Sequence, residues 1–189
     1  MKVRESGMPE QDIWESFFDA KTILAKLGLN EKCRSVLDFG CGYGTFSTIA
    51  AQKISGQVVA LEIDENMLNW AKLYAKNHNI KNIEFNQRDF ITDGSGLANN
   101  SVDYVMLFNI LHFEKPIELL KEAYRNLLIG GKLSVIHWNI DPETPRGPPM
   151  HMRPSPEQCL QWAKRVGFRL ANNEVIDLPP YHFGLLFEK

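Results

Sequence analysis

Residues 36–45 read VLDFGCGYGT, and this stretch decides the fold. A short apolar run ends in an acidic residue, and glycines then follow at alternate positions, Gly40, Gly42 and Gly44. The pattern predicts a buried strand that enters a tight turn, followed by a helix that begins near Thr45. Glycine accepts positive φ and lets a ligand approach where a Cβ would clash, and the first amides of the helix point at that ligand. The stretch therefore predicts a nucleotide-type binding site.

Short apolar segments alternate with helical patterns on the C-terminal side of this stretch. We expect strands at 35–39, 58–62, 83–86, 102–108 and 132–138, and helices at 45–54, 65–77, 116–128 and 156–166. The strands are apolar through most of their length, which is typical when both faces of a sheet are covered. This alternation predicts an α/β fold, namely a three-layer, doubly wound, Rossmann-like sheet that is mostly parallel.

The N-terminal region and one long segment depart from this alternation. Apolar residues at helical spacing predict a helix over 9–27 whose aromatic face, Trp14, Phe17 and Phe18, either forms a lid or packs in the core. Residues 139–156 are rich in proline and predict a long loop on the substrate side.

Two extended segments, 169–175 and 182–188, end the chain with no helix between them. They predict an antiparallel pair at the edge of the sheet. With no internal repeat, 1–189 is expected to be a single domain, with a helical lid over 1–30.

Composition narrows the function classes. A net charge of -2 over 189 residues argues against a protein built to grip a nucleic-acid backbone. Cys33, Cys41 and Cys159 are scattered and lack metal-ligand spacing, so no metal site is predicted and a reducing compartment fits. Without an apolar N-terminal region or an apolar run of roughly 20 residues, we expect a cytoplasmic monomer or homodimer. Its partner would be a small molecule, with no membrane and no stable nucleic-acid partner.

The spacing around the glycines bears on which nucleotide binds. A dinucleotide loop reads G-x-G-x-x-G, but Thr45 occupies the position of the last glycine, and no P-loop lysine follows. Glu62 ends the next predicted strand, about 20 residues past the loop, where an acid can accept both hydroxyls of a ribose. Asp64 also qualifies by position, although it directly precedes a helix and suits an N-cap better.

A second acidic position follows the third predicted strand. Asp89 could accept a hydrogen bond from an adenine amino group, with Phe90 packed near the ring. The alternative is a turn or capping aspartate, which is common.

The motifs VLDFGCGYGT, VVALEID, NQRDF, SVDYVMLFNILHF and LLIGGKLSVIHW together resemble those of class I S-adenosylmethionine-dependent methyltransferases. Within that class the chain is similar to the small-molecule enzymes of the ubiquinone and menaquinone biosynthesis type, from about residue 14 to the C-terminus. The resemblance implies a seven-stranded sheet whose antiparallel last strand lies beside the fifth. It also implies S-adenosylmethionine as cofactor, S-adenosylhomocysteine as product and a small-molecule methyl acceptor.

The resemblance implies which part of the cofactor each motif binds. It implies that Asp38 and the glycine-loop backbone hold the methionine end, and that Glu62 binds the ribose hydroxyls. It implies that Ile63 and the Asp-Phe pair of NQRDF surround the adenine, and that the Asn109 carbonyl lies near the sulfonium. The implied cofactor-binding set is Asp38, Gly40, Cys41, Gly42, Gly44, Glu62, Ile63, Asp89, Phe90 and Asn109.

Candidate acceptor-side residues follow the fourth and later strands. His112 is the candidate catalytic base, and the alternative is a histidine packed at a strand–helix junction. His137 could also face the acceptor, or it could be a core or surface residue of its strand. Tyr181 and His182, before the last strand, could face the same pocket. Arg146 and Arg153 could clamp an acidic group, unless they lie in a solvated loop.

Two other function classes stay open. One is an NAD(P)-dependent oxidoreductase, which Thr45 and the terminal strand pair disfavour. The other is a non-catalytic binding protein with the same fold, because methyl transfer requires no invariant catalytic side chain and a fold does not fix a function.

Overall fold

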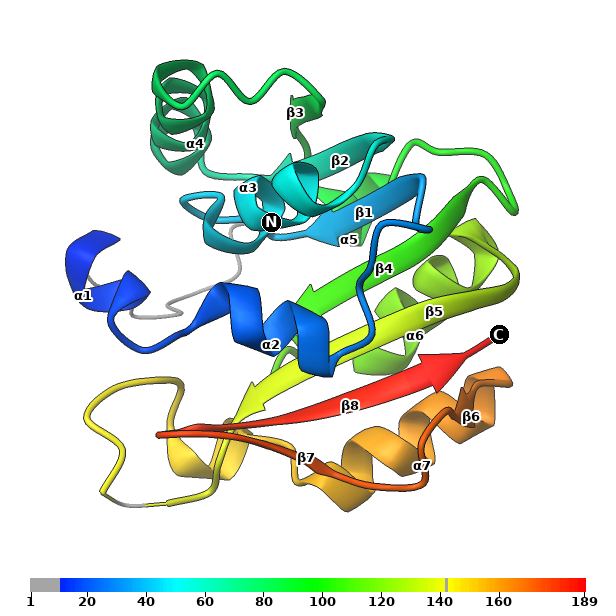
Figure 1. The fold of residues 1–189 in the computed structure, drawn as a ribbon. Coiled ribbons are helices and arrows are strands. Elements are labelled where there is room, and N and C mark those ends of the chain that lie inside the picture. The colour runs from blue at the N-terminus through cyan, green and yellow to red at the C-terminus, as the bar shows by residue number, and fades with distance from the viewer. Residues whose placement is uncertain (1–10, 142) are drawn as a thin grey trace.

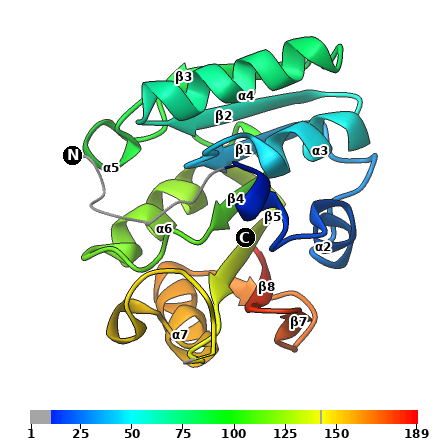
Figure 2. The ribbon, with the colours of Figure 1, turned by 90° about the vertical axis from the view of Figure 1, so that its left-hand side faces the viewer.

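A computed structural model describes residues 11–141 and 143–189 and shows one mixed sheet with helices on both faces (Figure 1, Figure 2). The strands are β1 (Ser35–Phe39), β2 (Gln57–Glu62), β3 (Ile83–Gln87), β4 (Val102–Phe108), β5 (Leu127–Trp138), β6 (Arg169–Leu170), β7 (Ile176–Leu178) and β8 (His182–Glu188). The helices are α1 (Gln11–Glu15), α2 (Ala20–Lys26), α3 (Thr45–Lys53), α4 (Glu65–Asn77), α5 (Phe90–Asp93), α6 (Pro116–Asn126), the 3-10 helix η1 (Met150–Met152) and α7 (Pro156–Val166).

The sheet has the order β3-β2-β1-β4-β5-β8-β6, and β7 also pairs with β8. Strands β1 to β5 are parallel to their neighbours, whereas β8 is antiparallel to β5. The mostly parallel α/β sheet and the antiparallel strand beside the fifth are therefore confirmed. The direction of winding reverses between β1 and β4, and ligands bind such sheets at the carboxyl ends of the strands at that point.

Two apolar cores lie on opposite faces of the sheet. Helices α6 and α7 pack on one face, and α2 and α3 pack on the other. Because both faces are covered, the central strands are buried along nearly their whole length, which explains the continuous apolar runs in the sequence. In Figure 1 the arrowheads of β4 and β5 point to the edge beside which α1 lies.

The prediction of one continuous helix over 9–27 is wrong. Residues 9 and 10 lie outside the described part of the chain. Helix α1 ends at Glu15, and α2 begins anew at Ala20. The break has a local cause, because the Asp19 side chain accepts a hydrogen bond from the backbone N–H of Thr22 and caps α2.

Other boundaries also differ from the expectation, most of all at β5, which begins at Leu127 instead of the predicted residue 132. Helix α6 ends at Asn126 rather than 128, because Leu127 already pairs with Val102 as the start of β5. The extended segment 169–175 is interrupted after Leu170 and resumes as β7, so the final region supplies two short strands instead of one. The sheet consequently has eight strands instead of seven.

Candidate functional site

The glycine loop joins the carboxyl end of β1 to α3. The backbone N–H groups of Gly40 and Cys41 both donate to the carbonyl of Leu61, at 2.8 and 3.0 Å, and tie the loop to β2. Gly40 and Gly44 have φ of +73° and +80°. A Cβ on Gly44 would lie 3.0 Å from the Cβ of Ala71, so this position needs glycine for its conformation and for the packing of α3 against α4.

Glu62 lies at the carboxyl end of β2 and is only 8% exposed. One carboxylate oxygen accepts a hydrogen bond from the N–H of Gly42 at 2.9 Å. The other accepts from the N–H groups of Ile63 and Asp64, at 2.8 and 2.9 Å. A carboxylate has about four lone-pair sites, and three of them accept these hydrogen bonds, so about one remains for a hydroxyl donor of a ligand. Glu62 thus shapes the loop, and its contact with a ribose stays a prediction.

Asp38 lies beneath the same loop and is 3% exposed. It accepts a hydrogen bond from the Ser47 hydroxyl at 2.5 Å. Burial raises the pKa of Asp38 to about 7; the Ser47 hydrogen bond opposes this shift, and the negative charge of Glu62 adds to it. A cationic ligand group near both acids would favour their ionised forms. Sequence reasoning missed Ser47, whose only signal was a polar residue on the buried side of a predicted helix.

Cys41 lies in the glycine loop, and its contact with the cofactor stays a prediction. Burial raises the pKa of its thiol well above the usual value, and the negative charges of Asp38 and Glu62 act in the same direction. The thiolate is the nucleophilic form of cysteine, so this environment opposes nucleophilic chemistry at Cys41.

The predicted adenine side lies at the start of α5. Asp89 caps this helix, because its carboxylate accepts from the N–H groups of Ile91 and Thr92. The Phe90 ring is buried and packs edge-on against Phe39, with ring centroids 5.3 Å apart. The contacts of Asp89 are therefore those of a helix-capping residue, and the Phe90 ring is part of the apolar core. An adenine contact from either residue stays a prediction, as does the one from half-buried Ile63.

Asn109 follows β4 in a left-handed conformation, with φ of +54°. Its backbone N–H donates to the carbonyl of Ile136 at 2.8 Å, which holds the turn against β5. Within the described residues, neither polar atom of its buried amide has a hydrogen-bond partner. Unpaired buried polar groups are rare, and non-glycine residues with positive φ gather at functional sites.

His112 lies after β4, three residues beyond Asn109, and is half-buried. Burial lowers the pKa of its ring, and the Asn109 backbone partly opposes this shift. A neutral ring can accept a proton, so the environment is compatible with the predicted base. The ring packs edge-on near His137, with centroids 5.6 Å apart.

The position of Arg153 contradicts both expectations for this residue, namely that it clamps an acidic group of the acceptor or that it is solvated in the loop. It is 5% exposed, and its guanidinium donates to the carbonyls of Asn139, Arg146 and Pro148 and to the Thr144 hydroxyl. Its hydrogen-bond donors therefore hold the loop together. Of the two arginines, Arg146 is the exposed one.

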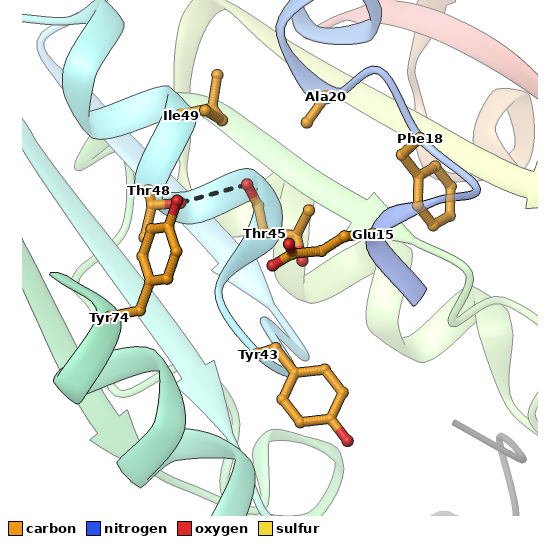
Figure 3. Close-up of a pocket in the computed structure, with 8 residues that line it drawn as sticks. All are labelled: Glu15, Phe18, Ala20, Tyr43, Thr45, Thr48, Ile49 and Tyr74. Carbon is orange, nitrogen blue, oxygen red and sulfur yellow. Dashed lines mark hydrogen bonds between the residues drawn. The ribbon is translucent and has the colours of Figure 1, made fainter. Parts of the chain in front are cut away.

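The N-terminal helices α1 and α2 and the residues between them pack on the body through aromatic residues, and residues 1–10 of the predicted lid lie outside the described part of the chain. Phe17 contacts Trp138, and Phe18 contacts Phe46 and His182, as the core-packing alternative expects. A cavity of about 250 Å³ remains between this N-terminal region and the glycine loop, and Figure 3 shows the Glu15 carboxylate turned toward Thr45 in it. The lining residues are Glu15, Phe18, Ala20, Tyr43, Thr45, Thr48, Ile49 and Tyr74.

Two searches of residues 11–141 and 143–189 gave negative results. No group of three or more His, Cys, Asp or Glu residues in this part of the chain is arranged to hold a metal ion. None of its helices combines the length and apolar character that crossing a membrane requires.

Comparisons with known proteins agree on one family. A family model described as "Methyltransferase domain" matches residues 30–175. The demethylmenaquinone methyltransferase of Lactococcus lactis is 34% identical over 116 residues, which are 54% of this chain and 41% of that protein. Phosphoethanolamine N-methyltransferase 3 of Arabidopsis thaliana is 32% identical over 104 residues, which are 51% of this chain and 20% of that protein. The match therefore spans less than half the length of either curated relative.

A solved structure matches over nearly the whole chain. The S-adenosylmethionine-dependent methyltransferase from Aquifex aeolicus has a TM-score of 0.81 and 25% sequence identity. The match covers 94% of this chain and 93% of that chain.

Proposed function

The chain belongs to the methyltransferase domain family, and on that premise we propose that it transfers a methyl group from S-adenosylmethionine to a small-molecule acceptor by in-line displacement. The observation that carries the proposal is the buried Glu62 carboxylate bonded to the N–H of Gly42. This contact joins an acid at the end of β2 to a glycine loop where the winding of the sheet reverses, which is where such sheets bind nucleotides.

The residues present fit this cofactor. Asp38 and Glu62 are both buried, and within the described residues neither carboxylate forms an ion pair with a lysine or arginine. Buried acids without a cationic partner are costly, and an incoming positive charge offsets that cost. S-adenosylmethionine carries both a sulfonium and an ammonium group, so its charge complements the pair.

The side chains of this protein would then mainly bind and orient. When bound, S-adenosylmethionine supplies a methyl group that its sulfonium has already activated. Asp38 and the loop backbone would hold the amino-acid end, Glu62 would accept the ribose hydroxyls, and the Asn109 carbonyl would face the positive centre. Holding two reactants in line can contribute roughly 7–11 kcal/mol to lowering a barrier. His112 would hold the proton of an acceptor that is protonated in its resting state.

A small acceptor is favoured by the charge of the chain. The net charge of -2 does not suit a protein that grips nucleic acid. The two curated relatives are named for different acceptors, demethylmenaquinone and phosphoethanolamine, so family membership leaves the acceptor to be found by experiment.

Thermal unfolding of the full chain with S-adenosylmethionine, S-adenosylhomocysteine, NAD and NADP tests the proposal. A ligand at 100 times its dissociation constant stabilises a protein by about 2.7 kcal/mol. We expect this from the adenosyl compounds and not from the dinucleotides, followed by release of S-adenosylhomocysteine when an acceptor panel is added. Stabilisation by NAD alone would contradict the proposal, and adenosyl binding without turnover on any acceptor would favour the non-catalytic alternative.

A further inference from the structure

Unpaired polar groups are concentrated at one edge of the sheet. In the described part of the chain, nine buried side-chain nitrogen and oxygen atoms lack a hydrogen-bond partner, and eight of them belong to Asn109, His112, His137 and His182. These residues lie after β4, near the end of β5 and at the start of β8. A folded protein leaves few such atoms unpaired, so a cluster of them calls for a ligand or a chemical role.

His112 and His137 meet because β4 and β5 are parallel neighbours. Phe108 pairs with Ile136, and the next residue, Asn109, donates its N–H to the Ile136 carbonyl. This register brings the turn after β4 beside His137, whose ring centroid lies 5.6 Å from that of His112 at an interplanar angle of 74°. His137 is 0% exposed, and His112 is partly exposed as a residue while both of its ring nitrogens are buried.

His182 is a separate feature on the other face of the sheet. Across the β5–β8 pair, His137 lies opposite Phe183, and Trp138 lies opposite His182. Adjacent residues of a strand point to opposite faces, so His137 and His182 diverge. The His182 ring contacts Phe18 and Trp138, at centroid distances of 4.5 and 4.1 Å. It is therefore an internal control for His137, equally buried and similarly unpaired.

The electrostatics around the pair limit what it can bind. Burial lowers the pKa of both rings, so each neutral ring offers one N–H donor and one acceptor nitrogen. After burial, the neighbouring His112 lowers the pKa of His137 most, and His182 and Arg153 act in the same direction, whereas the Trp138 backbone opposes them. Within the described residues no carboxylate is among the groups that shift this pKa, so an ammonium group would meet the positive charge of Arg153 alone, whereas a hydroxyl both donates and accepts hydrogen bonds.

We propose that His112 and His137 form the polar end of the acceptor subsite and bind an uncharged acceptor through its hydroxyl group. This assignment rests on the proposed methyl transfer, because it places the acceptor beside the carboxyl end of β4, next to the residues proposed for the cofactor. It excludes cationic amines as preferred acceptors.

Histidine ring signals test the proposal without requiring turnover. The full chain, labelled with ¹⁵N in histidine and saturated with S-adenosylhomocysteine, is titrated with benzyl alcohol and separately with benzylammonium, which have nearly the same shape. We expect benzyl alcohol to shift the ring nitrogens of His112 and His137 and to leave those of His182 unchanged, with little response to benzylammonium. Unchanged signals with benzyl alcohol, or a stronger response to benzylammonium, would overturn the proposal.

Kinetics on the acceptor panel provide the second readout. We expect His137→Phe to raise KM for a hydroxyl acceptor by about tenfold, the value of one hydrogen bond, while the dissociation constant for S-adenosylmethionine stays the same. His137→Gln, which keeps a donor and an acceptor, should recover part of the loss, and His182→Phe should not change KM. Melting curves establish that each variant is folded. Turnover confined to amines, or an equal KM for His137→Phe, contradicts the proposal, whereas absence of adenosyl binding contradicts the proposed function instead.

Discussion

The carboxylate of Glu62 accepts a hydrogen bond from the backbone N–H of Gly42 at 2.9 Å, across a separation of 20 residues. This acid fixes the shape of the glycine loop, and in the proposed function its remaining acceptor site receives a ribose hydroxyl. A substitution at this position should affect stability and ligand binding together.

Glu62→Ala should lower both quantities. The change leaves the N–H groups of Gly42, Ile63 and Asp64 without their acceptor, and an unsatisfied buried donor costs roughly 1–3 kcal/mol of unfolding free energy. Denaturant unfolding measures this cost, and calorimetric titration should show most of the S-adenosylmethionine affinity lost. The control is Glu65→Ala, an exposed acid nearby, which should stay within about 0.5 kcal/mol of the parent. Unchanged affinity in Glu62→Ala would mean that the ribose acid lies elsewhere.

The affinity for S-adenosylmethionine should rise as pH increases through about 7. Below this pH, the free folded protein keeps a proton on Asp38, because its pKa is raised to about 7. A cationic ligand favours the ionised acid, so binding must release that proton. Calorimetry in buffers of different ionisation enthalpy detects the release. Asp38→Asn should bind more weakly and show no such release, and proton uptake by the parent protein would contradict the assignment.

His182→Phe should reduce the loss of stability in acid. Burial lowers the pKa of His182 to about 3, from 6.5 in the unfolded chain. The unfolded state thus binds more protons below pH 6.5, and stability is lost as pH falls from there toward 3. Between pH 6.5 and 5 the loss is up to about 2 kcal/mol, at 1.36 kcal/mol per unit. Asp38 acts in the opposite direction in this range, so the variant and the parent must be compared by denaturant unfolding at each pH. Equal pH profiles would contradict the prediction.

Arg153→Met should loosen the loop over 139–153 without weakening cofactor binding. The variant leaves the carbonyls of Asn139, Arg146 and Pro148 without their donor, and an unpaired buried acceptor costs roughly 1–3 kcal/mol. Limited proteolysis should cleave this loop faster, whereas the exposed Arg146→Met should digest like the parent. Equal digestion rates for all three proteins would contradict the role given to Arg153.

Most strands of the sheet could be predicted from the sequence, because a strand that is buried on both faces consists mainly of apolar residues. The bounds of β1 and β4 agree with the prediction, since most residues of each strand are apolar, with Asp38 and Asp103 as the charged exceptions. The errors come from interactions that periodicity does not record. The Asp19 side chain restarts a helix, and pairing of Leu127 with Val102 ends α6 early.

The location of a site residue could be predicted where its position at the end of a strand determines its place in the fold. Glu62 ends the second strand as expected, and its depth in the fold follows from the parallel register. The hydrogen bonds of Asp38 with Ser47 and of Arg153 with its loop depend on tertiary placement. The local sequence does not show whether the guanidinium of an arginine is bonded to buried carbonyls or solvated. Only the structure distinguishes the two environments.

The hydrogen bonds of Arg153 have a consequence for how this protein can change. Three of its four acceptors are main-chain carbonyls, which every amino acid supplies. The path of the loop therefore depends on Arg153 and on Gly147, where an added Cβ would lie 2.9 Å from the Trp138 ring, more than on the side chains at its exposed positions. Evolution, or a mutant library, can vary the exposed positions of this segment and still keep its backbone trace, so this surface can diversify while the fold stays intact.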